Sequence, residues 1–258
     1  MIGCIIQARM GSSRLPGKVM RKVDDKNPLL YYVLKQHQYC RTIDKIIVAT
    51  TNLKKDDVIA KFVQKNNVEC FRGSSDDVLD RYYQCSKKFS FSTIVRVTAD
   101  NPLNDPTIVD MVVEKFKKGT YDFITNSIPR TFPQGISVEI FSFKALQEAW
   151  KSAKLPSERE HVTPHFYNNK HIFKFFNVTH STNVSHLRFT VDRINDLKLV
   201  RAIIKNINKR PILMEDILNL FKERPELTLI NKNYVPDEGY YKSLKEDEEF
   251  KKSQMKHD

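Results

Sequence analysis

The sequence predicts an α/β fold of three layers, in which a mostly parallel sheet carries helices on both faces. Short apolar or β-branched runs recur along the first half of the chain, and segments with helical periodicity separate them. This alternation is typical of parallel sheets, because parallel neighbours need a crossover that is usually a helix. The chain has 258 residues, 40% of them hydrophobic, which is enough for one sizeable core. We therefore expect one domain, over residues 1–240.

The first half contains strand and helix segments in strict alternation. The expected strands are Ile2–Gln7, Lys45–Thr50, Val68–Phe71, Thr93–Thr98 and Asp122–Asn126. Helices between them begin after residue pairs that favour a helix start, because an acid or amide caps the first turn and proline suits it. These pairs are Asn27-Pro28, Asp56-Asp57 and Asp105-Pro106.

After Asn126 the pattern is less regular. The expected elements are a strand at Ile136–Phe141, a helix at Phe143–Lys151, an interrupted helix at Ser157–Asn168, and strands at Ile172–Val178 and Leu187–Val191. Pro164 interrupts the second helix, because proline removes a backbone donor. Residues 241–258 have mixed charge and few apolar side chains, so we expect an exposed charged helix or tail there.

The net charge of +12 favours polyanionic partners: RNA, a membrane surface or phosphorylated small molecules. The lysines are dispersed rather than gathered in one basic block with interleaved aromatics, which favours solvated helix faces over a specific nucleic-acid groove. The apolar run Ile2–Ile6 is too short for a signal sequence or a membrane span. We therefore expect a cytoplasmic protein without a membrane partner or a specific nucleic-acid partner.

The loop Gln7–Lys18 directly follows the first expected strand, where α/β sheets place their ligands. Two glycines let its backbone amides approach an anion closely, and three cations add positive charge. The glycines are Gly11 and Gly17, and the cations are Arg9, Arg14 and Lys18. The glycine spacing is not that of a Walker loop, and Val19 stands where that loop requires Ser or Thr. The pattern suits a triphosphate, and the alternative is a basic surface turn.

Asp100 follows the expected strand Thr93–Thr98, so its carboxylate should lie at the sheet edge that carries the loop. A hard oxygen ligand there suits Mg²⁺, which takes one or two carboxylates together with phosphate oxygens. A lone aspartate after a strand is more often a helix cap or a turn residue. The neighbouring motif favours the metal.

Six motifs follow one another over roughly residues 2–195. They are Gln7–Lys18, Arg72–Ser74 with Asp77–Tyr82, Arg96–Pro102, Gly135–Glu139, Glu160–Pro164 and Arg188–Asp192. In this order they resemble cytidylyltransferases related to spore-coat polysaccharide biosynthesis proteins, and more distantly the acylneuraminate and Kdo cytidylyltransferases. The resemblance implies a nucleotide-binding fold similar to that of type A glycosyltransferases.

The resemblance also implies the transfer of CMP from CTP to a small anionic acceptor, a sugar acid or a phosphorylated metabolite, with release of pyrophosphate. Such transfers depend on positioning and charge neutralisation more than on covalent chemistry. The expected cofactor is Mg²⁺, and the expected pathway is surface polysaccharide biosynthesis. Family resemblance further implies a homodimer, formed through the irregular segment between Ile128 and Lys170.

Site residues follow from the matching motif positions. Nucleotide binding is expected of Ala8, Arg9, Gly11, Arg14, Lys18, Arg72, Gly73 and Ser74. The expected catalytic residues are Arg14, Lys18 and Asp100, and the expected metal ligands are Asp100 and Asp192. His161 and His165 have Pro164 between them, so we expect packing rather than a metal pair. Helical spacing predicts that Trp150 is buried against the sheet.

The acceptor is expected over Gly135, Ser137 and Glu139. The family pattern there resembles GxDVE, and this chain has the neutral Ser137 in place of the acid, which should change the acceptor that is tolerated. Gly135 should let the backbone approach the ligand, and Glu139 should share a strand face with Ser137. The alternative is that Ser137 faces solvent and its identity hardly matters.

Two other functions stay open at this point. A nucleotide-sugar glycosyltransferase could use the same fold, although Asp100-Asn101-Pro102 lacks the second acid of a DxD triplet. A non-catalytic RNA-binding protein could exploit the positive charge.

Overall fold

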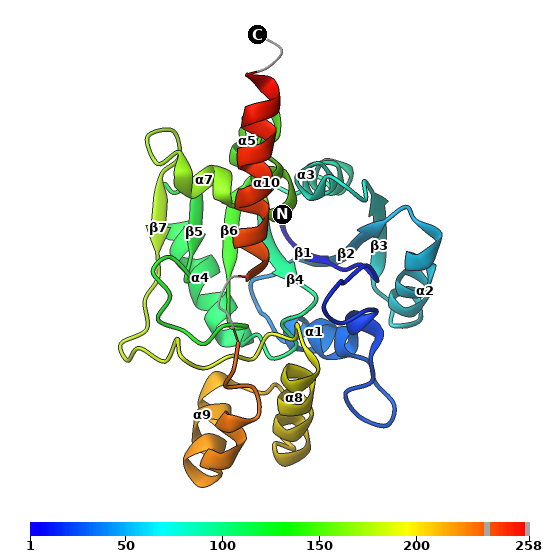
Figure 1. Ribbon diagram of the computed structural model, residues 1–258. Helices are drawn as coiled ribbons and strands as arrows, with labels where there is room; N and C mark the ends of the chain where they lie inside the picture. Colours follow the sequence, from blue (N-terminus) through cyan, green and yellow to red (C-terminus); the bar gives the residue numbers. More distant parts are fainter. Residues whose placement is uncertain (235–237, 256–258) are drawn as a thin grey trace.

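In the computed structural model, which describes residues 1–234 and 238–255, one seven-stranded sheet spans the molecule in the order β3-β2-β1-β4-β6-β5-β7 (Figure 1). The strands are β1 (Ile2–Gln7), β2 (Lys45–Thr51), β3 (Glu69–Gly73), β4 (Thr93–Thr98), β5 (Phe123–Thr125), β6 (Glu139–Ser142) and β7 (Phe175–Asn177). All neighbours are parallel except β6, which runs antiparallel to both β4 and β5. The mostly parallel sheet is confirmed.

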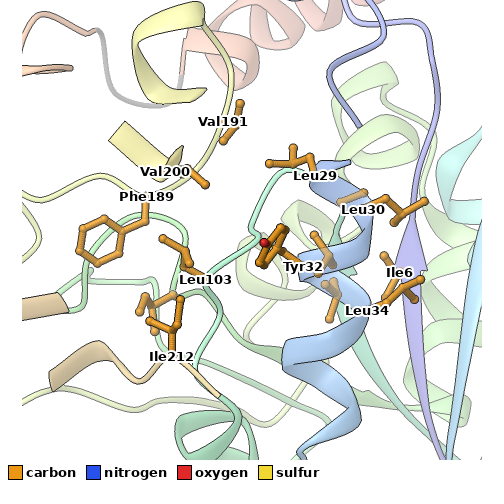
Figure 2. Packing of buried hydrophobic residues seen from close by; sticks show 14 of the residues in the cluster. Ile6, Leu29, Leu30, Tyr32, Leu34, Leu103, Phe189, Val191, Val200 and Ile212 are labelled. Atoms are coloured by element: carbon orange, nitrogen blue, oxygen red, sulfur yellow. The ribbon is translucent and has the colours of Figure 1, made fainter. Parts of the chain in front are cut away.

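Helices cover both faces of this sheet, because alternate strand residues point into two separate cores. The helices are α1 (Leu29–Gln38), α2 (Asp57–Lys65), α3 (Val78–Lys88), α4 (Pro106–Lys118), α5 (Phe143–Ser152), α6 (Pro156–His161), α7 (Pro164–Asn168), α8 (Ile194–Asn206), α9 (Met214–Glu223) and α10 (Glu238–Gln254). The larger core takes side chains from α1, α2, α4, α8 and α9, and the smaller one from α3, α5 and α7. Figure 2 shows the larger core, where Leu30 and Leu34 of α1 lie beside Ile6 of β1.

Most predicted elements are present, with ends shifted by a few residues. The strand expected at Leu187–Val191 is wrong. This segment forms only an isolated bridge to Gln134 and a bond from Val191 N to Asp100 O (2.8 Å). Its apolar side chains are buried by α8 and α9, two helices that the sequence analysis did not identify, rather than by pairing in the sheet.

The helix starts differ in how well they match the prediction. Asp105 caps α4 as expected, since its carboxylate accepts from Thr107 N (2.8 Å). Pro28 itself occupies the N-cap of α1, so Asn27 is not the cap. Asp56 makes no capping bond to α2 and has a different partner, described below.

The C-terminal segment forms α10, which begins two residues before the expected boundary at 240. A helix was one of the two expected forms, but the expectation that it is exposed is wrong for one face, where Ser243 and Asp247 are buried. These side chains are polar, so a search for apolar spacing could not find the face that packs. Residues 256–258 of the expected tail lie outside the described residues.

The segment between Ile128 and Lys170 contains β6, α5, α6 and α7, which correspond to the strand, the helix and the interrupted helix expected there. Its role in a dimer stays a prediction. Within the described part of the chain, no helix has the length and apolar character needed to cross a bilayer.

Candidate active site

The site lies where β1 and β4 end. These strands are parallel neighbours with Gln7 opposite Thr98, so the loop after β1 and the residues after β4 begin side by side. A cavity of about 790 Å³ opens there, lined by that loop, the end of β4, α6 and α10. A second cavity of about 270 Å³ adjoins it. The two share five lining residues, namely Arg14, Arg96, Thr98, Asp100 and Asp192.

The loop Gln7–Lys18 is held from beneath by a buried carboxylate. Asp56 is fully buried, and its Oδ1 accepts from the backbone amide of Met10 (2.7 Å). Within the loop, Gly17 has a φ of +67° and donates its N–H to Met10 O (3.1 Å), which closes the loop on itself. Ala8, Arg9, Gly11, Arg14 and Lys18 of the predicted nucleotide site all line the larger cavity.

One ammonium group joins the two predicted metal ligands. Lys18 Nζ lies 2.8 Å from Asp100 Oδ2 and 2.8 Å from Asp192 Oδ1. Burial disfavours the charged lysine, but the charges and hydrogen bonds of the two carboxylates outweigh it and raise the pKa of Lys18. The structure thus brings together side chains that lie 82 and 174 residues apart in the chain.

Asp192 is held by more cations than Asp100. Arg14 Nη2 lies 2.8 Å from Asp192 Oδ1, and the buried Arg188 places Nη2 2.6 Å from Asp192 Oδ2. Desolvation alone would raise the pKa of Asp192, yet Lys18 and Arg14 lower it well below its usual value. Asp192 therefore remains ionised throughout the neutral range.

A second layer of bonds fixes the backbone at Asp192. Asp196, in the first turn of α8, accepts from the amides of Asp192 (3.0 Å) and Arg193 (2.8 Å). The other oxygen of Asp196 accepts from Arg188 Nε (3.2 Å). The helix start, rather than a strand, positions this metal-ligand candidate.

The predicted acceptor residues line the smaller cavity together with Asp100 and Asp192. Ser137 is among them, and its carbonyl accepts from Asn104 Nδ2 (3.1 Å). Glu139 forms an ion pair with Arg96 and accepts from Thr163 Oγ1 (2.7 Å). Ser137 lies just before β6, and only Glu139 belongs to the strand. Both residues nevertheless line the smaller cavity.

Gly135 lines the smaller cavity, and its backbone conformation requires a glycine. Its φ is +104°, and a Cβ there would lie 2.5 Å from the backbone nitrogen of Thr190. The glycine therefore lets two backbone segments pack closely beneath the cavity. The expected approach of this backbone to a ligand stays a prediction.

Arg72, Gly73 and Ser74 lie at the end of β3, outside the residues that line either cavity. The Arg72 guanidinium donates to Thr51 O (3.0 Å) and Leu53 O (2.9 Å). Ser74 Oγ accepts from the backbone amide of Asp77, and Asp77 does line the larger cavity. Contact between these three residues and a nucleotide stays a prediction.

Several lining residues were not predicted. Arg96 is a charged residue in a mostly buried strand, and it lies two residues before Thr98, on the same face of the strand. This spacing could have indicated that Arg96 points to the site. Arg159 lies on α6 and donates its Nε–H to Asp77 (2.9 Å), a contact with no sequence signature. The lining residues of α10 follow the last motif by more than 40 residues, so spacing gave no guide to them.

The histidines of α6 and α7 serve in packing, as expected. His161 Nε2 lies 2.9 Å from Ser243 Oγ, and burial, aided by the charges of Arg96 and Arg9, lowers its pKa to about 4. His165 is buried, with Nδ1 2.9 Å from Glu158 Oε1. Among the described residues, no cluster of three or more His, Cys, Asp or Glu side chains could hold a metal.

Trp150 packs between helices rather than against the sheet. Its ring stacks on Tyr83 of α3 with centroids 4.2 Å apart, and its Nε1–H donates to Asp80 Oδ1 (2.9 Å). The expected position against the sheet is therefore wrong, because the outer edge of α5 faces α3 and the indole donor has a carboxylate within reach there.

Comparisons with known proteins agree with this geometry. The family model described as cytidylyltransferase matches residues 3–232. The chain is 38% identical to an uncharacterized protein of Methanocaldococcus jannaschii over 231 residues, which cover 89% of this chain and 93% of that one. It is 30% identical to the spore coat polysaccharide biosynthesis protein SpsF of Bacillus subtilis over 231 residues, or 86% and 94% of the two chains.

The fold is similar to that of a solved cytidylyltransferase from Leptospira borgpetersenii serovar Hardjo-bovis, with a TM-score of 0.85 and 33% identity. That comparison covers 91% of this chain and 98% of the other. The chain therefore belongs to the cytidylyltransferase family of nucleotidyltransferases.

Proposed function

We propose that the protein transfers CMP from CTP to a small anionic acceptor and releases pyrophosphate. We call the loop Gln7–Lys18 the phosphate loop. One observation carries this proposal: a contact joins Lys18, Asp100 and Asp192, and it lies between the larger cavity, which the phosphate loop lines, and the smaller cavity. The arrangement suits a reaction in which two substrates approach one phosphorus atom from adjoining spaces.

The two carboxylates fit Mg²⁺. Asp100 and Asp192 already converge on a single cation, the Lys18 ammonium group, with both N–O distances at 2.8 Å. Mg²⁺ takes one or two carboxylates plus phosphate oxygens, so no third protein ligand is required. Asp100 and Asp192 would hold the ion, which would neutralise charge on the phosphates.

The protein's own groups then have distinct tasks. Backbone amides of the loop, with Arg14 and Lys18, bind the phosphate chain of CTP. A deprotonated acceptor oxygen in the smaller cavity attacks the α-phosphorus, and the bond to the bridging oxygen of the leaving pyrophosphate breaks. Negative charge moves onto the pyrophosphate as this happens, and Arg14 and Lys18 are placed to neutralise it.

The acceptor we propose is a sugar acid or a phosphorylated metabolite. The smaller cavity, about 270 Å³, is lined by three carboxylates, Asp100, Asp192 and Glu139, and by three arginines, Arg14, Arg96 and Arg130. The guanidinium groups are the donors that an anionic acceptor would bind. Similarity to the spore coat protein SpsF supports a role in surface polysaccharide biosynthesis. The lack of a second acid next to Asp100 speaks against a glycosyltransferase, and membership of an enzyme family speaks against a non-catalytic RNA-binding protein.

Pyrophosphate release tests this function. The purified chain is incubated with each of the four ribonucleoside triphosphates and Mg²⁺, against a panel of acidic sugars and phosphorylated metabolites. We expect release that needs both CTP and one acceptor class. Turnover with another triphosphate alone would contradict the choice of CTP, and release independent of every acceptor would contradict transfer.

A further inference from the structure

The larger cavity has a wall that lies outside the part of the chain matched by the family model. That match ends at residue 232, whereas Gly239, Lys242, Ser243 and Glu246 of α10 line the cavity together with the phosphate loop. Figure 1 shows α10 as the red helix. This helix packs on α6. The cavity that would receive the nucleotide is therefore completed by a helix that lies beyond the matched residues.

Polar contacts hold α10 in this place. Asp247 accepts from the backbone amide (2.8 Å) and the hydroxyl (2.6 Å) of Ser157, and both residues are buried. One turn earlier, Ser243 Oγ lies 2.9 Å from His161 Nε2. A buried carboxylate is unfavourable without its hydrogen-bond donors, so these bonds fix the helix to α6.

The first turn of α10 also reaches the phosphate loop. Glu238 Oε2 lies 3.6 Å from Arg14 Nη1 and 2.9 Å from Arg193 Nη2. The helix thus begins beside Arg14, which we propose binds phosphate, and it lines the cavity as far as Lys242 and Glu246.

The charges that line the cavity single out two lysines. Seven cationic side chains of the described residues line it: Arg9, Arg14, Lys18, Arg96, Lys154, Arg159 and Lys242. Five have a short ion pair with an acid: Arg9–Glu160, Arg14–Asp192, Lys18–Asp100, Arg96–Glu139 and Arg159–Asp77. Lys154 has no such pair with the carboxylates of residues 1–234 and 238–255, and Lys242 has only the looser contact to Glu246 at 3.7 Å. These two can meet an anion without breaking an internal pair.

We propose that Lys242, together with Lys154, binds phosphate oxygens of the triphosphate, so that α10 is a functional wall of the nucleotide site. The proposal rests on the proposed binding of CTP. Lys242 keeps 80% of its side chain exposed, so its contribution is that of a solvent-facing charge: modest in size and sensitive to salt.

A pair of charge reversals on α10 tests this. Lys242→Glu is compared with Lys245→Glu, which makes the same change of charge on the same helix at an exposed residue that does not line the cavity. Titration calorimetry with Mg²⁺ measures the affinities of CTP and of inorganic tripolyphosphate, a probe that carries no base. We expect Lys242→Glu to weaken both by at least about fivefold at low salt, and Lys245→Glu to change them less than about twofold.

Hydrogen exchange on the unmodified chain gives a second measurement that does not depend on a variant. CTP with Mg²⁺ should slow amide exchange in residues 239–247, and leave α9 unchanged. If CTP binds and protects the phosphate loop while α10 is unprotected and both variants bind alike, the α10 proposal is overturned and the proposed function stands. If the unmodified chain binds neither probe, the proposed function fails, and the α10 proposal fails with it.

Discussion

At the scale of single residues, Asp100 and Asp192 share one ammonium group but differ in their surroundings. Asp192 is surrounded by Lys18, Arg14 and the buried Arg188, whereas Lys18 is the one cation that the ion pairs of the described residues give to Asp100. Removal of either carboxylate would take away half of the proposed metal site. Removal of Asp192 would also leave a buried guanidinium with one partner fewer.

We therefore expect the two alanine variants to differ in stability and to agree in activity. Asp100→Ala and Asp192→Ala should both abolish nucleotidyl transfer. Urea unfolding should show a loss of about 1 kcal/mol for Asp100→Ala and about 3 kcal/mol for Asp192→Ala, because breaking a buried pair strands the remaining charge. Near-normal turnover of both variants at saturating Mg²⁺ would refute their assignment as metal ligands.

Ser137 gives a prediction about the acceptor. It lines the smaller cavity beside Asp100, so Ser137→Asp adds a negative charge where an anionic acceptor would lie. The kcat/KM for the acceptor should fall by at least about tenfold, while the KM for CTP changes less than about twofold. The steady-state kinetics of both substrates measure this. An unchanged acceptor profile would remove Ser137 from the acceptor site.

Some site residues could be predicted from the sequence and others could not, for a physical reason. Lys18 and Asp100 follow strands whose parallel pairing brings their ends together, so the strand pattern alone places them at one edge. Lys242 and Arg159 lie on helices whose packing depends on polar contacts between distant segments. No periodic pattern records such contacts.

At the scale of elements, the phosphate loop depends on the connection that follows β2. Asp56 lies in the short helix Lys54–Asp56 and binds the loop through the amide of Met10, while Thr51 Oγ1 donates to its other oxygen. The pair Asp56-Asp57 predicts a helix start, where acids are common. Its actual partner comes from a loop 46 residues earlier, and a local pattern cannot reveal that partner.

We therefore predict that weakening the bond between Asp56 and Met10 will make the phosphate loop less rigid, although none of its cationic side chains is changed. Asp56→Asn keeps the shape but weakens a charge-assisted bond to a backbone amide, worth about 1–2 kcal/mol. The affinity for CTP should fall by about tenfold with Arg14 and Lys18 intact. Asp110→Asn, which makes the same change at a buried acid that accepts from the backbone amides of Arg41 and Thr42 and lines neither cavity, is the matched control. Equal affinities in the two variants would show that the loop does not need this anchor.

At the scale of the whole molecule, the two cores on opposite faces hold the strand ends that form the site. The larger core contains an ionisable residue. His37 of α1 is 1% exposed, with Nδ1 2.7 Å from Val33 O, and burial lowers its pKa to about 4. Its Nε2 lies 3.4 Å from Asn104, which in turn donates to the carbonyl of Ser137 at the smaller cavity.

Stability should therefore decrease as the pH falls. The folded state keeps His37 neutral down to a pKa of about 4, whereas the unfolded chain takes up this proton near pH 6.5, so acid favours unfolding between these two values. Urea unfolding at pH 7 and pH 5 should differ by about 2 kcal/mol on account of this residue. His37→Gln should remove that portion of the pH dependence. A variant with the same slope as the unmodified chain would show that His37 does not carry it.

The Lys18 ammonium between Asp100 and Asp192 means that the two carboxylates already have a counter-ion within the chain. A free divalent cation would have to displace this lysine, so its affinity without nucleotide should be low. When a triphosphate offers Lys18 new partners, the two carboxylates become available to the metal ion. Nucleotide and metal ion should therefore bind cooperatively. Because such coupling is reciprocal, each should strengthen the binding of the other by the same factor.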